Sequence, residues 1–596
     1  MNRLPHRLKN LFAILLIAGM SPLAAHAADP VISNGGTAIN NFVSSSAAVG
    51  GPFGGLDINH LVGADRFYAA GYTGTSSVIA NIEGGFVWNG HETLGAATVQ
   101  FRAPGHAGTQ LGEYDWHATL VGEALAGRDN GGGSYQRGIA YGASLWSGAI
   151  ATQWNGTGFT TSWGWADGNA FTYPYVQALV NGVNGRTADV VNCSWGYGGN
   201  TYGDDVFSDT IDGLARQSRR TVVFSAGNNG PGSDTVLSPA NGYNSIVVGA
   251  LGSDTDAAPY RTISGFSSRG PADYRDPANG AVSGVRARVD ITAPGQNLTL
   301  AEYGGTTGGN KSGSDPTSGA TNYYSFNSKG TSFAAPIVSG GASLLCDAGY
   351  ARFGGGNSID ARVIKAVLLN SADKPVGWNN GQTTANGVTE TKQGLDYTYG
   401  AGILNLSKAF DQYTGGTTDV PGTGHGNLGF VKPTGWDFGT VLKGGVNDYF
   451  IAGSLLADTT FTATLNWMAN RQYVATAAGG SITASNLEFT DLDLELWSVT
   501  GGIPTSLIAR SDSLYNNTEH FSFALPATGD YMIQVVWSGA RFDTVNTTSE
   551  DYAIAWSGTA ATIAPESDTL ILFLVCTTIT AAGSALRFGS TQTKKT

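Results

Sequence analysis

The sequence predicts an α/β fold, a mostly parallel sheet with helices on both faces, followed by an antiparallel β-sandwich. A chain of 596 residues is long enough for more than one domain. Strand-like and helix-like apolar runs alternate from residue 77 to about 404, which is typical of a parallel sheet with helical crossovers. After a Gly-, Thr- and Pro-rich stretch at 415–424, short runs of alternating polarity are separated by turn residues, which is typical of a sandwich.

The individual elements are predicted from apolar runs of suitable length and period. In the first domain, strands are expected at 78–82, 188–191, 221–224 and 245–248, and helices at 117–125 and 332–345. In the second domain, the runs 448–451, 461–467 and 531–537 are predicted strands. Functional groups are expected at the carboxyl ends of the parallel strands, where open α/β sheets gather their binding residues.

Composition excludes one class of function. Charged residues make up only 13% of the chain and the formal net charge is −13, which argues against binding to nucleic acid. Low charge together with 86 glycines suits a secreted, loop-rich protein.

Residues 1–27 are predicted to be a signal peptide. Basic residues at positions 3, 7 and 9 precede an apolar centre at 11–20, and Ala25-His26-Ala27 is a small-x-small cleavage site. The apolar centre is too short for a membrane-spanning helix. Export is therefore expected, which places the mature protein outside the cell or at its surface or outer envelope.

The heptapeptide 330–336, Gly-Thr-Ser-Phe-Ala-Ala-Pro, carries the strongest functional signal. It opens an apolar run, so Ser332 is predicted at the start of a buried helix, beside unpaired backbone N–H groups and the positive end of the helix dipole. That position suits a nucleophile whose attack creates an oxyanion. An ordinary helix cap is the alternative. The heptapeptide resembles the serine motif of the subtilisin-like serine proteases (subtilases), and the resemblance implies that Ser332 is the nucleophile.

Two further stretches resemble subtilase motifs and supply a base and an oxyanion donor. The stretch 115–122 is similar to the histidine motif, although Ala118 stands where glycine is usual and Leu120 where a second histidine is usual. The resemblance implies that His117 is the general base. The stretch 224–230, which as a bare pattern is also compatible with a turn, implies that Asn228 donates to the oxyanion together with the backbone N–H of Ser332.

The acid motif departs from the family pattern. Subtilases have Asp-Thr-Gly or Asp-Ser-Gly at the end of the first strand, whereas this chain has Ile82-Glu83-Gly84-Gly85. The order Glu83, His117, Ser332 keeps the family order of acid, base and nucleophile. Glu83 is therefore predicted to orient His117, and Asp115 is the alternative acid. Asp115 is disfavoured because residues two apart at a helix entry point away from each other.

Two short segments are predicted to bind substrate. They resemble the strands that flank the substrate's side-chain pocket in subtilases, where extended edges pair with an extended peptide. The residues are Ser194, Trp195 and Gly196 in one segment and Ser225, Ala226 and Gly227 in the other.

The C-terminal region resembles two kinds of module found on exported proteins. Runs at 491–496 and 528–531 are similar to jelly-roll modules appended to secreted bacterial peptidases. The segment 561–596 has Pro565-Glu566, an apolar run at 570–586 and basic residues at its end, and it is similar to surface-sorting tails with a Pro-Glu-Pro motif, although Ser567 replaces the second proline. Attachment to a membrane or cell surface is expected, and a disordered end is the alternative.

The predicted function is hydrolysis of peptide bonds by an exported serine endopeptidase acting on protein or peptide substrates, without a cofactor or a required metal. One alternative is a non-catalytic pseudoprotease that binds peptides or glycans at the surface. Another, a sedolisin-type enzyme with Glu as the base, is disfavoured because His117 lies in its own motif. The predicted boundaries are 28–76 for a lead-in segment, 77–412 for the peptidase domain, 413–426 for a linker and 427–560 for a sandwich that folds independently.

Overall fold

A computed structural model describes most of the chain. The described residues are 11–14, 33–34, 37–38, 55–104, 110–129, 137–155, 158–162, 170–198, 201–252, 260–304, 321–416, 430–475 and 482–561. The predicted signal peptide apart from 11–14, most of the lead-in before residue 55, residues 417–426 of the predicted linker and the predicted tail from 562 onward lie outside them. No helix within the described ranges is both long enough and apolar enough to cross a membrane.

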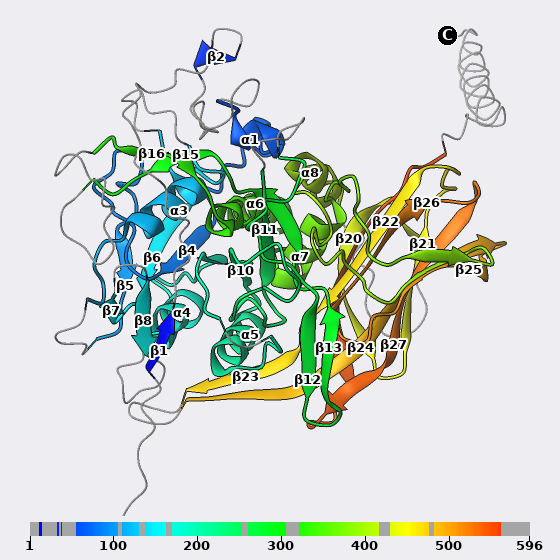
Figure 1. The fold of residues 1–596 in the computed structure, drawn as a ribbon. Helices are drawn as coiled ribbons and strands as arrows, with labels where there is room; N and C mark the ends of the chain where they lie inside the picture. The colour runs from blue at the N-terminus through cyan, green and yellow to red at the C-terminus, as the bar shows by residue number, and fades with distance from the viewer. Residues whose placement is uncertain are drawn as a thin grey trace, which may run out of the picture.

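A seven-stranded sheet forms the centre of the α/β domain (Figure 1). Every neighbouring pair of its strands is parallel, which confirms the fold class predicted from the sequence. In spatial order the strands are β14 (Ile291–Pro294), β11 (Ile246–Leu251), β10 (Thr221–Ser225), β9 (Val190–Cys193), β4 (Val78–Glu83), β6 (Ser144–Ala149) and β5 (Val99–Phe101).

Helices cover both faces of this sheet because neighbouring residues of each strand point to opposite sides. Val190 and Val223 pack into a cluster with α3 (Trp116–Ala126), α6 (Thr331–Phe353) and α7 (Ala361–Asn370). Val191 and Val222 pack instead with α4 (Thr172–Val176) and α5 (Val206–Ser218). Both faces are apolar, as expected for a parallel sheet buried between two helical layers.

Shorter elements complete the α/β domain. The helices are α1 (Ile58–Leu61), α2 (Asp65–Ala69), η2 (Gln177–Asn181), η3 (Gly356–Ile359) and α8 (Leu406–Thr414). The strands are β1 (Leu11–Ile14), β2 (Ser33–Asn34), β3 (Thr37–Ala38), β7 (Gln153–Trp154), β8 (Phe159–Ser162), β12 (Ala272–Asp276), β13 (Gly280–Arg286), β15 (Leu298–Ala301) and β16 (Tyr324–Ser328).

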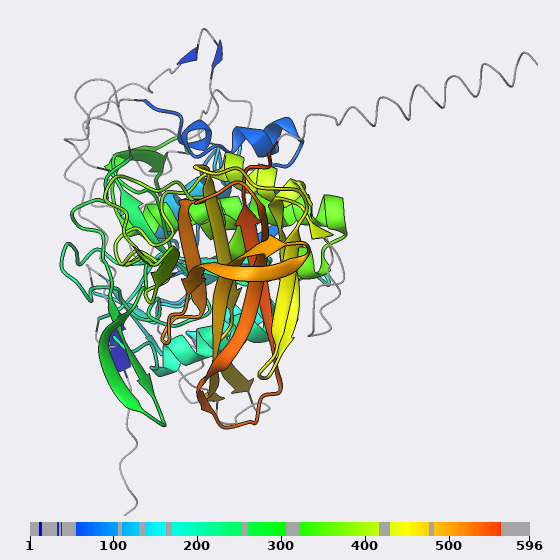
Figure 2. The ribbon, with the colours of Figure 1, turned by 90° about the vertical axis from the view of Figure 1, so that its right-hand side faces the viewer.

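The sandwich domain consists of two mainly antiparallel sheets, which Figure 2 shows from their own side of the molecule. One sheet contains β17 (Thr383–Ala385), β18 (Val388–Thr391), β25 (Ile503–Ser511), β24 (Ile482–Thr500), β27 (Asp530–Asp543), β21 (Val446–Ile451), β19 (Phe430–Val431) and β23 (Asn470–Ala475). The other contains β20 (Thr434–Leu442), β28 (Ser549–Ser557), β22 (Thr460–Trp467) and β26 (Thr518–Ala524). Apolar side chains of both sheets form one cluster between them.

The chain of the α/β domain also contributes to the sandwich. The hairpin β17–β18 lies within the predicted peptidase segment 77–412, yet β18 pairs in parallel with β25, so that Thr389 faces Ala509. The larger sandwich sheet therefore begins with residues that precede the predicted boundary between the domains.

The smaller sandwich sheet is buried on both faces. Along β28, Tyr552, Ile554 and Trp556 point into the core of the sandwich. The alternate residues Ala553 and Ala555 belong to the same apolar cluster as α6 and α7 of the α/β domain. This one sheet thus contributes to two cores.

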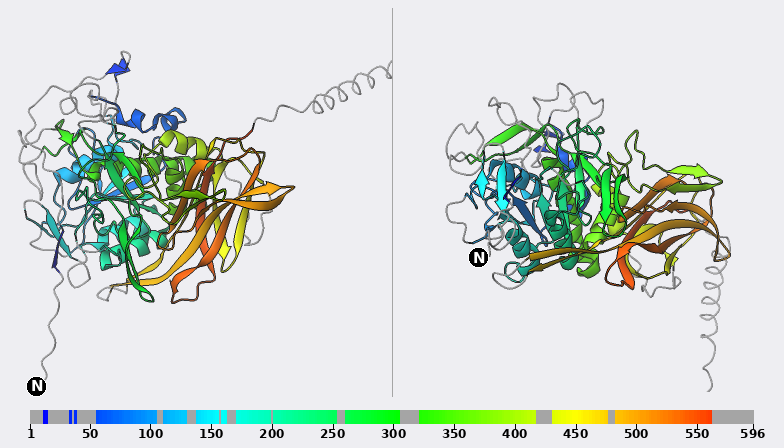
Figure 3. Two further views of the ribbon diagram at one scale, coloured as in Figure 1. Left: turned by 45° about the vertical axis from the view of Figure 1, so that its right-hand side comes forward. Right: turned by 60° about the horizontal axis from the view of Figure 1, so that its bottom comes forward.

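A long arm extends the contact between the two domains. Strands β23 and β24 form a hairpin that crosses α5, as both views in Figure 3 show. The Gln217 side chain donates to the Tyr473 carbonyl at 2.8 Å, and the Asn244 amide exchanges two hydrogen bonds of 2.9 Å with the backbone of Ala469. A Cβ atom at Gly213 would lie only 2.6 Å from the Tyr473 nitrogen, so the arm rests directly on α5.

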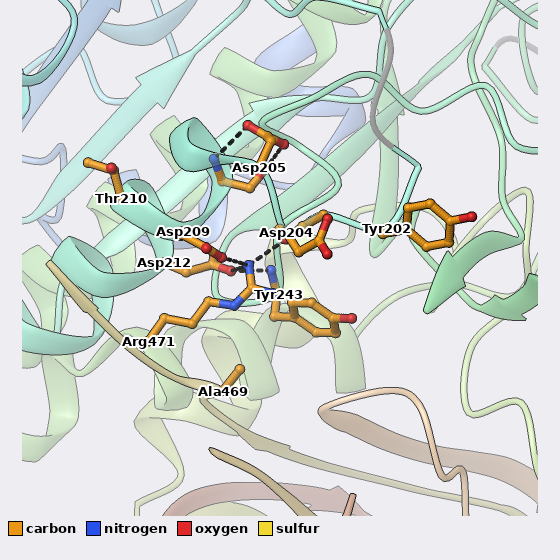
Figure 4. Close-up of polar contacts among 12 residues, drawn as sticks. Tyr202, Asp204, Asp205, Asp209, Thr210, Asp212, Tyr243, Ala469 and Arg471 are labelled. Carbon is orange, nitrogen blue, oxygen red and sulfur yellow. Dashed lines mark hydrogen bonds and ion pairs between the residues drawn. The ribbon is translucent and has the colours of Figure 1, made fainter. Parts of the chain in front are cut away.

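Arg471 at the root of this arm is buried among groups of the α/β domain (Figure 4). Its guanidinium lies 2.8 Å from an Asp209 oxygen and 3.0 Å from an Asp212 oxygen. It also donates to the carbonyl of Gly203 and lies 4.5 Å from the centre of the Tyr243 ring. A buried cation that neutralises two buried carboxylates fixes the arm in one position.

Replacing Arg471 with alanine is expected to lower the free energy of unfolding by about 3–5 kcal/mol, because Asp209 and Asp212 would stay buried without their cation. Urea unfolding monitored by tryptophan fluorescence measures this. The matched control is Arg66→Ala, which removes an ion pair with Asp411 and a contact with the Phe410 ring at a side chain that is 54% exposed. That change is expected to lower stability by about 1 kcal/mol or less. Equal losses for the two variants would contradict the proposed role of Arg471.

Candidate active site

Glu83 and His117 meet at the carboxyl end of strand β4, which lies inside the seven-stranded sheet. Glu83 is the last residue of β4, and His117 lies in the first turn of α3. The Glu83 Oε2 atom lies 3.1 Å from His117 Nδ1, and both side chains are fully buried. The other carboxylate oxygen accepts a hydrogen bond of 2.7 Å from the backbone N–H of Ser194. The carboxylate is therefore held by two donors.

Asp115 has a different role. It is the N-cap residue of α3, and its carboxylate accepts a 3.0 Å hydrogen bond from the backbone N–H of His117. In the described contacts it is thus Glu83 that meets the imidazole ring.

The two glycines after Glu83 lie close to other groups: a Cβ atom at Gly84 would lie 2.6 Å from the Trp154 ring, and one at Gly85 would lie 2.5 Å from the Glu113 carbonyl.

The environment of His117 suits a base. Burial by itself disfavours the charged imidazolium, but the hydrogen bond and the negative charge of Glu83, together with the negative charge of Asp115, outweigh it, so the pKa of His117 is raised above its ordinary value. The second ring nitrogen, Nε2, is buried and has no hydrogen-bond partner among the described residues. One ring nitrogen is therefore oriented by a carboxylate, and the other remains open to a reacting group.

Ser332 lies in the first turn of α6, as the sequence predicts, and the residue that follows it contacts the base. The ring of Phe333, the following residue, has its centre 5.7 Å from that of His117. The Ser332 hydroxyl donates to the carbonyl of Ser194 at 3.0 Å. In this conformer the hydroxyl thus contacts the predicted substrate-binding segment.

Asn228 is oriented by Thr331, a residue that the sequence analysis did not single out. The Thr331 hydroxyl accepts from the N–H of Gly227 at 3.1 Å and donates to the Asn228 amide oxygen at 3.0 Å. The N–H of Thr331 donates to the same amide oxygen at 2.9 Å. The position of Thr331 inside the serine motif, directly before Ser332, is the only sequence signal for this role.

Two N–H donors converge above Gly330. A Cβ atom built at Gly330 would lie 3.5 Å from Asn228 Nδ2 and 3.6 Å from the backbone nitrogen of Ser332. These are the two donors predicted for the oxyanion. The open space beside Gly330 is consequently where an oxyanion would receive both hydrogen bonds.

Replacing Gly330 with alanine is expected to lower kcat/KM by about 10²–10³, the size of effect seen when one oxyanion donor is removed. The new methyl group would stand in front of both donors at contacts of 3.5 Å and longer, and the positive φ of Gly330 adds backbone strain, so the assay is made on folded protein. Hydrolysis of a peptide p-nitroanilide measures the effect.

Gly354, which ends the same helix α6, provides the control. Both glycines have positive φ, +156° at Gly330 and +73° at Gly354, but a Cβ atom at Gly354 would meet no atom within 4 Å. Gly354→Ala therefore introduces backbone strain away from the site. Near-normal activity of Gly330→Ala, or an equal loss in Gly354→Ala, would contradict the placement of the oxyanion.

The two predicted substrate-binding segments follow neighbouring strands. Ser194 to Gly196 continue from β9, while Ser225 ends β10 and leads into Ala226 and Gly227. Trp195 differs from the expectation for a substrate-binding side chain: it is 2% exposed, its indole N–H donates to the Ile82 carbonyl, and its ring packs into the core. Only its backbone is therefore available to a peptide.

A family model and curated relatives match this chain. The model of the Subtilase family matches residues 97–402, just over half of the chain. That range includes His117, Asn228 and Ser332, whereas Glu83 precedes it. Bacillopeptidase F of Bacillus subtilis (strain 168) is 26% identical over 385 residues, and Serine protease AprX of the same strain is 30% identical over 154 residues. The matches cover 61% and 26% of this chain, but only 22% and 30% of those relatives' own lengths.

Solved structures also align with the chain. The structure of the prenylagaramide maturation protease PagA has 21% sequence identity and a TM-score of 0.40, and the alignment covers 59% of this chain and 97% of the PagA chain. A protease of Pseudoalteromonas arctica has 18% sequence identity and a TM-score of 0.38, and the alignment covers 58% of this chain and 93% of that protease's chain. None of these relatives gives support to the non-catalytic alternative.

Proposed function

This chain belongs to the Subtilase family, and we propose that it is an exported serine endopeptidase that hydrolyses peptide bonds through an acyl-enzyme. The observation that supports the proposal is the contact of Glu83 with His117, together with the contact of Phe333, the neighbour of Ser332, with the His117 ring and the two N–H donors near Gly330. Acid, base, nucleophile and oxyanion donors are the complete set that acyl transfer by serine requires.

The reaction begins with a rotation of the Ser332 side chain. The hydroxyl leaves the Ser194 carbonyl and turns toward His117 Nε2, which takes its proton as the oxygen attacks the peptide carbonyl. The developing oxyanion receives hydrogen bonds from Asn228 Nδ2 and the Ser332 N–H. Glu83 keeps the proton on Nδ1 and stabilises the imidazolium while it exists.

Collapse of the tetrahedral intermediate releases the amine product. His117 gives its proton to the leaving nitrogen, and the acyl group remains as an ester on Ser332. Water then enters and attacks the ester carbonyl as His117 removes one of its protons. When the bond between the acyl carbon and the Ser332 oxygen breaks, His117 returns that proton to the Ser332 oxygen and the carboxylic acid product is released. Every proton transfer passes through the same ring nitrogen.

The location of the enzyme and its attachment follow from the two ends of the chain. The basic and apolar start with its small-x-small site supports export by a signal peptide. The apolar tail beyond residue 561 supports attachment to a membrane or cell surface. The substrates are proteins or peptides that bind in extended form along the segments at 194–196 and 225–227.

Labelling with an active-site fluorophosphonate tests the proposal. The probe phosphonylates a serine only when a base and an oxyanion site activate it, so peptide mapping by mass spectrometry is expected to find the adduct on Ser332. Absence of labelling in folded, purified protein, or an adduct on another residue, would overturn the assignment.

A further inference from the structure

One segment of the α/β domain joins the two predicted substrate-binding segments. The backbone N–H of Leu237 donates to the Ala226 carbonyl at 3.1 Å. The next residue, Ser238, exchanges hydrogen bonds of 2.8 and 3.1 Å with Tyr197, which directly follows Gly196. Residues 237–238 are therefore bonded to both segments and close the space between them.

The Leu237 side chain fills that space. A Cβ atom at Gly196 would lie 2.8 Å from Leu237 Cβ and 3.2 Å from its Cδ1 atom. A Cβ atom at Gly227 would lie 2.7 Å from Leu237 Cγ and 2.9 Å from the same Cδ1 atom. One leucine side chain is therefore in contact with both facing glycines, and the absence of side chains at these two positions is what admits it.

The nucleophile lies at the other end of the first segment and beside Gly227 of the second. The Ser332 hydroxyl bonds to the Ser194 carbonyl, and Thr331 bonds to the Gly227 N–H. Two residues of extended chain separate Ser194 from Gly196, about 7 Å. A substrate side chain that enters between the segments beside Ser332 meets Leu237 within that short distance.

We propose that Leu237 closes the inner end of the side-chain pocket and restricts cleavage to peptide bonds that follow small, uncharged residues such as Gly, Ala or Ser. The proposal rests on the proposed peptidase function and specifies its substrate class. Large apolar side chains are excluded by the volume of one buried leucine, which is 7% exposed and held between two backbone walls.

A series of tetrapeptide p-nitroanilides that differ only in the residue before the anilide tests this. The wild-type enzyme is expected to have a kcat/KM at least about 10-fold higher for Ala than for Phe, because a pocket rejects groups larger than its volume. In Leu237→Ala the Phe-to-Ala ratio of kcat/KM is expected to rise by about 10- to 200-fold, and in Leu237→Val by a smaller factor. A ratio of two substrates is independent of the active fraction, so a partly unfolded variant still gives an answer.

The matched control is Val236→Ala, which truncates the preceding residue. Val236 belongs to the apolar core on the α5 side of the sheet, so its loss is expected to lower stability and leave the substrate ratio unchanged. Wild-type enzyme that cleaves after Phe as well as after Ala, or an unchanged ratio in both Leu237 variants, would overturn the proposal. Enzyme that is labelled at Ser332 and shows either result refutes only the role of Leu237, whereas protein with neither labelling nor hydrolysis refutes the peptidase function itself.

Discussion

Ser332→Ala is expected to lower kcat by about 10⁶-fold, the loss found when the nucleophile of a serine peptidase is removed. The variant keeps the oxyanion donors, because one of them is the backbone N–H of residue 332 and the other belongs to Asn228. Residual hydrolysis above the uncatalysed rate is therefore still expected from the oxyanion site and substrate binding. A p-nitroanilide assay measures the rates of the variant and of the wild-type enzyme. Burst titration gives the concentration of active sites that converts the wild-type rate to kcat.

The fold is expected to survive this change, because within the described part of the chain the Ser332 hydroxyl makes a single hydrogen bond, to Ser194. A matched control is Ser339→Ala on the same helix, which removes a buried hydroxyl bonded to Asn192 and Ala335. Ser339→Ala is expected to lower stability and retain labelling and turnover. If Ser332→Ala were to hydrolyse the substrate at a rate near that of the wild type, another residue would be the nucleophile.

Glu83→Gln is expected to lower kcat by about 10³–10⁴, as the loss of the orienting acid does in related catalytic triads. The amide cannot accept the Nδ1–H bond as a carboxylate does, and it presents an N–H₂ group that favours the wrong tautomer of His117. Glu83→Asp is a second informative variant. Its carboxylate is withdrawn by roughly 1 Å, a displacement that costs about 10²-fold in activity. Asp115→Asn, which retains an N-cap residue for α3, is expected to leave kcat close to the wild-type value.

The pH profile of kcat/KM shows whether Glu83 acts on His117 through its charge or has only a structural role. His117 must be neutral to accept a proton, so kcat/KM rises as pH increases through its pKa. Glu83 holds that pKa above the ordinary value, and removing its charge is expected to move the acid limb of the profile to lower pH. If Glu83→Gln lost activity with no shift of this limb, Glu83 would act through packing alone.

The sequence was sufficient for residues whose role is tied to local structure. Glu83 ends a buried strand, and His117 and Ser332 begin apolar helices, so the strand and helix patterns already place them at one end of the sheet. The motifs identify which end carries the chemistry. The conformer of Ser332 was not predictable, because its hydrogen bond to Ser194 depends on a segment 138 residues away.

Long-range pairing accounts for the features of the structure that the sequence did not predict. The turn of the hairpin β17–β18 can be predicted from its Asn-Gly pair, because Asn386 and Gly387 both adopt the positive φ that such a turn requires. Its partner β25 lies more than a hundred residues later, and nothing in the local pattern assigns the hairpin to that sheet. Arg471 likewise resembles a surface arginine in sequence, because its partner Asp212 is 259 residues away.

The two-sided burial of β28 has a consequence for the timing of enzyme assembly. This strand ends at Ser557 and is the last strand of the described chain, yet both apolar cores depend on it. Neither core is complete while the ribosome or an export channel still holds the segment that forms β28. Both cores are therefore expected to reach their full stability only after almost the whole described chain has been synthesised.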